Sequence, residues 1–149
     1  MKNLYEAPVY NEIVERMNRL SPSSERQWGK MNVSQMLAHC KEAFRVPLSE
    51  QPMKRAFIGS LLGSLFKKQL YSDKPWKQGL PTSPMFKITG DRDFETEKKE
   101  LSELVTRFHQ LGPEKTGLYP HPFFGAFTKE QWGMSMYKHL DHHFRQFGA

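Results

Sequence analysis

The sequence has one cysteine, no long apolar run and no alternating strand pattern. Cys40 has no second cysteine with which to form an internal disulfide, which suits a reducing compartment. No apolar run approaches the roughly 20 residues that a membrane-spanning helix needs, and the N-terminal residues lack the apolar core of a signal peptide. We therefore expect a cytoplasmic protein without a membrane span.

The composition is that of a globular chain, with 38% hydrophobic and 26% charged residues among 149. A chain of this length buries a sizeable core as one domain. The sequence therefore predicts a single domain over residues 1–149.

Acidic residues are scarce between residues 51 and 90, and Asp73 is the only one there beside seven lysines and arginines. The net charge of +6 belongs to this segment. Its basic residues alternate with Phe, Leu and Gly on what reads as a packed helix, so we expect no nucleic-acid partner. The segment could instead attract an anionic substrate or a thiol cofactor.

Helical periodicity and capping signals predict an all-α protein with four main helices. Apolar residues recur three and four positions apart in each, and Gly112-Pro113 is expected to end the third. An extra helix and a proline-rich crossover are expected between the second and third. The expected ranges are 8–20, 33–46, about 91 to 111, and 128–147 for the main helices, 54–71 for the extra helix and 73–89 for the crossover.

The extra helix has a small and apolar middle, with Gly59 and Gly63 spaced as GxxxG and basic pairs on either side. One reading is a helix packed over the bundle or at a contact between two copies. The other is an amphipathic helix at a membrane surface.

The last predicted helix contains His139, His142 and His143. Residues four apart lie on one helix face. At 100° per residue, His139 and His143 fall in the middle of the apolar stripe, whereas Asp141 points the opposite way, where we expect solvent. Buried imidazoles require partners, which are either hydrogen bonds or a shared metal ion.

A third imidazole is available from the second helix, where His39 borders the buried face. Three neutral imidazoles, His39, His139 and His143, would leave open positions at a divalent metal, as in catalytic sites. They fit several ions unevenly, and we expect zinc or nickel. Gln146, one turn past His143, is expected to hydrogen-bond a ligand histidine.

Several of these motifs resemble an uncharacterised family within the DinB-like superfamily. They are Trp28-Gly29-Lys30-Met31, Met36-Leu37-Ala38-His39-Cys40, His121-Pro122-Phe123-Phe124-Gly125, Trp132, and Lys138 to Phe147. The resemblance implies a four-helix bundle of up-down-down-up connectivity and a metal bound by His39, His139 and His143. It also implies homodimers and relatives that are transferases or isomerases dependent on bacillithiol, mycothiol or glutathione.

The leading hypothesis is therefore a metal-dependent enzyme, either a thiol-dependent transferase or a hydrolase, that acts on a small-molecule substrate. His142 and His121 are candidates for proton transfer. The alternative is a non-catalytic bundle that binds a metal or a small ligand. Cys40 lies within the apolar stripe of its helix, where a thiol is structural and inert.

Overall fold

The computed structural model describes residues 1–54, 67–80 and 82–149. Within these ranges the chain has four α-helices and two short 3-10 helices, and no strand. In chain order they are α1 (Ala7–Arg19), α2 (Val33–Arg45), η1 (Lys68–Tyr71), η2 (Pro84–Phe86), α4 (Phe94–Lys115) and α5 (Lys129–Gln146). The expected all-helical class is confirmed for this part of the chain.

The helices begin where the capping signals predict. Asn32 and Gln35 form a reciprocal capping box at the start of α2, and Thr128 and Gln131 form another at α5. These two boxes fix the first turns of the helices that carry the three candidate ligands.

The end of α4 differs in detail from the prediction. Gly112 leaves helical geometry at a φ of 67°, as expected for a helix-ending glycine. After this kink, however, the chain makes a further helical turn that begins with Pro113 and runs to Lys115.

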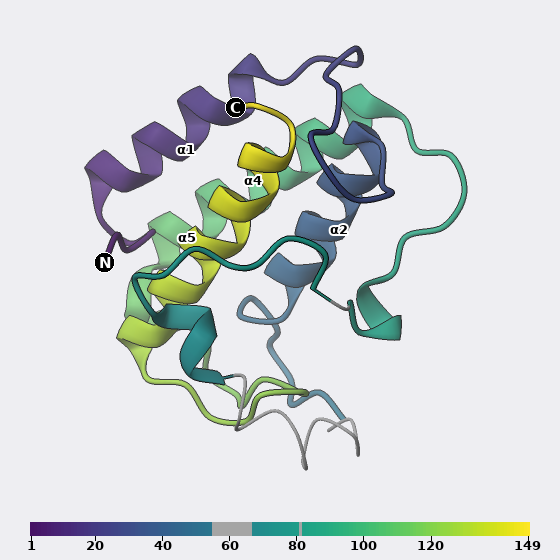
Figure 1. Ribbon diagram of the computed structural model, residues 1–149. Helices are drawn as coiled ribbons and strands as arrows, with labels where there is room; N and C mark the ends of the chain where they lie inside the picture. Colours follow the sequence, from purple (N-terminus) through teal and green to yellow (C-terminus); the bar gives the residue numbers. More distant parts are fainter. Residues whose placement is uncertain (55–66, 81) are drawn as a thin grey trace.

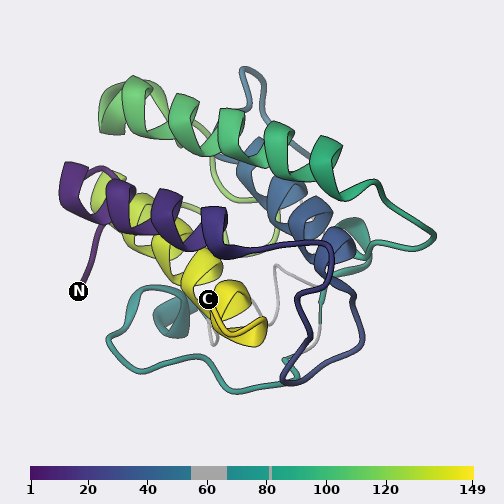
Figure 2. The same ribbon diagram turned by 90° about the horizontal axis from the view of Figure 1, so that it is seen from above.

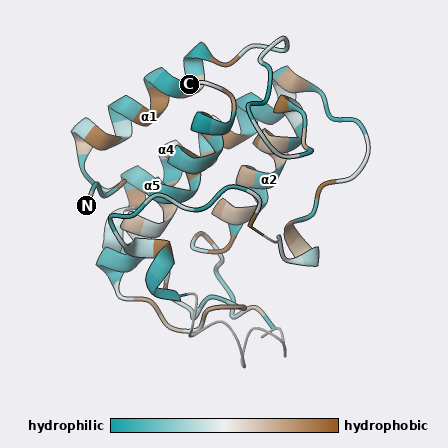
Figure 3. Cartoon of the chain, viewed as in Figure 1, coloured by the Kyte–Doolittle hydropathy of each residue, from teal (hydrophilic) through white to brown (hydrophobic). Residues whose placement is uncertain are grey.

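The helices pack so that the backbones of α4 and α5 each lie against both α1 and α2, whereas the backbones of α1 and α2 are not in contact with each other (Figures 1 and 2). Figure 3 shows hydrophilic and hydrophobic residues alternating around the helical turns, as amphipathic helices require. The core is the set of buried apolar side chains from all four, which includes Ile13, Met17, Met36, Leu37, Phe44, Leu101, Val105, Phe108, Trp132, Leu140 and Phe144.

The described parts of the connection between α2 and α4 pack on the helices. The predicted helix over 54–71 falls largely on residues 55–66, outside the described ranges, and so does its GxxxG motif. After residue 67, η1 packs on α5 and the following residues cross in front of that helix (Figure 1). Farther along, η2 packs on α2. The expected extended crossover is thus interrupted by one short 3-10 turn.

None of the described helices combines the length and apolar character needed to cross a bilayer.

Candidate metal centre

Three histidines from two helices converge on one point. His39 comes from α2, and His139 and His143 come from successive turns of α5. Each offers a ring nitrogen within 4.8 Å of those of the other two. The ring centroids are 5.0, 4.7 and 4.8 Å apart for the pairs 39–139, 39–143 and 139–143. The grouping expected from the sequence is therefore present, and occupancy by a metal stays a prediction.

The tautomer of His39 follows from its backbone partner. Its Nδ1 lies 2.8 Å from the carbonyl oxygen of Phe86, in η2. A carbonyl only accepts hydrogen bonds, so His39 Nδ1 carries the proton and Nε2 keeps its lone pair. That lone pair faces His139 Nε2, 3.0 Å away.

The tautomer of His143 is set by a chain of two hydrogen bonds. Gln146 Nε2 donates to the carbonyl oxygen of Trp28 at 2.8 Å, which orients the amide. Gln146 Oε1 then accepts from His143 Nδ1 at 2.9 Å, so Nε2 of His143 is unprotonated. Gln146 is thus hydrogen-bonded to a candidate ligand histidine, and its role beside a metal ion stays a prediction.

Gly29 leaves room for the Gln146 side chain that makes these two hydrogen bonds. It has a φ of +83°, and a Cβ there would lie 2.4 Å from Gln146 Nε2. The Trp28-Gly29 turn, which lies outside the helices, therefore helps to position Gln146 against His143.

Burial keeps the three imidazoles neutral. It lowers the pKa of His143 to about 3, and it lowers the pKa of His139 far below its usual value, with the nearby His143 adding to the effect. Burial also lowers the pKa of His39, opposed by its bond to Phe86. Neutral rings with free lone pairs are the form that binds metals.

The hydrogen bonds of the His139 ring nitrogens show whether a cation fits between the three histidines. Because His39 Nε2 can only accept, His139 must donate its own Nε2 proton across the 3.0 Å contact. Its buried Nδ1 then has no partner among the described residues. A cation held by the Nε2 atoms would take the place of that shared proton. A donor set of three imidazole nitrogens can hold a divalent metal ion.

His142 lies beside this cluster rather than in it. Its ring is 5.1 Å from that of His143, and two indoles flank it, Trp28 at 5.8 Å and Trp76 at 5.4 Å. Burial lowers its pKa. The structure leaves its proposed role in proton transfer as a prediction.

His121 lies in the loop before α5, among Phe86, Phe124, Phe127 and Trp132. Its Nδ1 accepts the backbone N–H groups of Phe123 and Phe124 at 3.0 and 3.2 Å, so its proton is on Nε2. Burial lowers its pKa to about 4. Proton transfer by His121 also stays a prediction, and this geometry makes Nε2–H a hydrogen-bond donor.

The sequence interpretation missed the segment that covers the site. Lys138, buried on α5, donates to the carbonyl oxygens of Gln69 and Ser72 at 2.5 and 2.6 Å and to Ser72 Oγ at 3.1 Å. Trp76 Nε1 donates to the same Gln69 carbonyl at 2.9 Å. The indole of Trp76 thereby lies 5.7 Å from the ring of His139. The available signal in the sequence was Lys138, a charged residue directly before the predicted ligand His139, which needs hydrogen-bond acceptors if it is buried.

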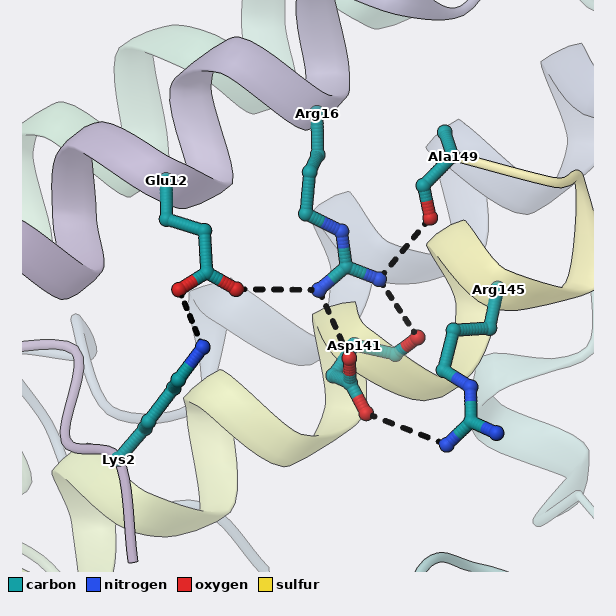
Figure 4. Close-up of polar contacts among 6 residues, drawn as sticks. All are labelled: Lys2, Glu12, Arg16, Asp141, Arg145 and Ala149. Carbon is teal, nitrogen blue, oxygen red and sulfur yellow. Dashed lines mark hydrogen bonds and ion pairs between the residues drawn. The ribbon is translucent and has the colours of Figure 1, made fainter.

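Asp141 is only partly exposed to solvent, contrary to the helical-wheel expectation. Its Oδ1 accepts from buried Arg16 of α1 at 2.7 Å (Figure 4). Arg16 also donates to the carbonyl oxygens of Asp141 and Ala149. The expectation failed because α1 packs against the face of α5 that a single-helix projection leaves uncovered.

Cys40 is fully buried, and burial raises the pKa of its thiol. Its expected role as a structural thiol agrees with this position, because a protonated thiol is a poor nucleophile.

The fold and the site together define a helical-bundle protein with a buried cluster of three histidines that could hold a metal. Residues 5–149 match the family described as protein of unknown function (DUF1569), and the chain belongs to that family. No curated protein and no solved structure matches the chain significantly.

Proposed function

We propose that this protein is a metal-dependent enzyme of the DinB-like superfamily, with a zinc or nickel ion held by His39, His139 and His143. The convergence of three neutral imidazole nitrogens within 4.8 Å carries the proposal. A divalent ion would lower the pKa of a water or thiol that it binds, or polarise a carbonyl group.

The chain's own residues would orient the ligands. The Phe86 carbonyl and the Gln146 amide each accept the Nδ1 proton of one ligand histidine, which directs Nε2 inward. Three protein ligands leave positions open for a reactant, which favours a catalytic site over a closed structural one. His142 and His121 are the proposed proton-transfer residues.

The resemblance to the DinB-like superfamily supports three further proposals: the up-down-down-up connectivity, thiol-dependent transferase chemistry on a small-molecule substrate, and a homodimer. Hydrolase chemistry is proposed because a bound divalent ion can activate a water. A cytoplasmic location is proposed because the sequence has a single cysteine. Light scattering of the purified protein tests the dimer.

Elemental analysis of protein never exposed to a chelator tests the metal. We expect one zinc or nickel ion per chain in the wild type, and loss of that ion in His139→Ala and His143→Ala. His109→Ala is the matched control, because His109 lies on α4 against Tyr10. A metal-free wild type, or variants that retain the metal, would refute the proposal. Metal without turnover across a panel of thiol cofactors would favour the non-catalytic alternative.

A further inference from the structure

A small cleft lies on α5 beside the histidine cluster. Its volume is about 50 Å³, room for one or two water-sized groups. Trp76 and His142 line the cleft and also contact the cluster, so these two side chains form the wall between them. The other lining residues used below are Trp28, Lys138, Asp141 and Arg145.

The charge of the cleft is positive. Asp141 is neutralised from the far side, because its Oδ1 pairs with Arg16 at 2.7 Å. All three N–H groups of Lys138 are taken up by Gln69 and Ser72. The cleft therefore has a fixed ammonium in its wall whose donors are already used.

Arg145 is the cation that a ligand could engage. Its side chain is 54% exposed, and its contact with Asp141 is long, at 3.9 Å. The last carbonyls of α5 are capped by the N–H groups of residues 147–149, which reduces competition for its donors. A guanidinium in this position retains its fork of N–H groups for a planar anion.

The wall also contains a donor that lacks an acceptor. Trp28 Nε1 is buried and has no hydrogen-bond partner among residues 1–54, 67–80 and 82–149. Leaving such a buried donor unpaired is unfavourable. Trp28 lines the cleft, so an acceptor oxygen that reached this N–H from there would satisfy it.

We propose that this cleft binds a carboxylate group of the substrate, with Arg145 as the charged anchor and Trp28 Nε1–H as the second donor. A carboxylate matches the available volume, the planar fork of Arg145 and the positive charge of the cleft. That the carboxylate belongs to the substrate rests on the proposed function; the binding of a carboxylate does not.

Acetate is the probe, added to metal-free protein in a buffer without other carboxylates or phosphate. The indole N–H signals of Trp28 and Trp76, assigned through Trp→Phe variants, report binding by NMR. We expect saturable shifts of both signals in the millimolar range, and at least tenfold weaker binding by Arg145→Gln. Arg107→Gln, which removes an exposed arginine from α4, should bind acetate as the wild type does.

Three outcomes would overturn the proposal: no saturable shift, equal binding by Arg145→Gln, or inorganic phosphate binding as tightly as acetate. The metal-free form keeps this result separate from the metal itself. Acetate binding by a protein that never acquires metal supports the cleft and refutes the proposed enzyme. A protein that acquires metal, but whose metal-free form binds no acetate, supports the metal site and refutes the cleft.

Discussion

The Nε2 atoms of His39 and His139 lie 3.0 Å apart, although the two residues are 100 positions apart in the chain. The contact joins α2 to α5, and His143 completes the group from the next turn of α5. Two neutral rings can share one proton at this distance, whereas three rings with inward lone pairs can share one cation. The residues that orient the rings should therefore control metal affinity more than they control folding.

Gln146→Ala should weaken zinc affinity by about 10- to 100-fold, because His143 loses the acceptor that fixes its tautomer. Competition with a chromophoric chelator measures the change. Gln27→Ala is the control, since the side chain of Gln27 is exposed. Zinc affinity equal to that of the wild type in Gln146→Ala would show that His143 is oriented by other contacts.

Gly29→Ala should weaken zinc binding through steric displacement of Gln146. Gly79→Ala is the matched control, because Gly79 also has a positive φ, +72°, but a Cβ there meets nothing within 4 Å. Both variants should lose about 1 kcal/mol of stability from backbone strain. Only Gly29→Ala should also lose zinc affinity, and equal affinities in the two variants would contradict the assignment of Gly29 to the site.

Local signals predicted most of the described helices. The capping boxes at Asn32 and Thr128 and the spacing of buried residues such as Ile13 and Met17 depend on neighbours within a turn or two, so the sequence carries them directly. The histidine cluster was predictable for the same reason, because the i, i+4 spacing places two rings on one face.

The features that were missed depend on contacts between distant segments. Lys138 binds carbonyl oxygens more than 60 positions away, and Arg16 covers Asp141 from α1. A helical projection describes one helix and does not contain its neighbours. The helical turn after Gly112 was missed because a proline at a first helical position starts a helix as readily as it ends one.

Lys138→Met should loosen the segment that holds Trp76 over His139. The carbonyl groups of Gln69 and Ser72 would lose their charged donor, at a cost of about 1–2 kcal/mol. Hydrogen exchange of the amides in residues 69–76 should accelerate, while α5 stays protected. Lys129→Met, an exposed lysine at the start of α5 that pairs with Glu114, is the control. Unchanged exchange in Lys138→Met would mean that other contacts dock the segment.

Acid should destabilise the metal-free protein well before the carboxylates titrate. Burial lowers the pKa of His143 to about 3 and that of His121 to about 4, whereas an unfolded histidine titrates near 6.5. Below about pH 6.5 the unfolded chain binds protons that the native chain does not. The free energy of unfolding therefore falls with falling pH, by about 1.4 kcal/mol per pH unit for each such histidine, and this contribution is complete above pH 6.5.

Urea unfolding at pH 7 and pH 5.5, in the presence of a chelator, measures the slope. His121→Asn isolates one group, because the Asn Oδ1 can accept the same backbone N–H groups of Phe123 and Phe124 without titrating. The variant should lose about 1 kcal/mol less than the wild type between the two pH values. If the wild type is equally stable at both, its buried histidines are already partnered by a cation that the chelator does not remove, or they are not buried in the native state.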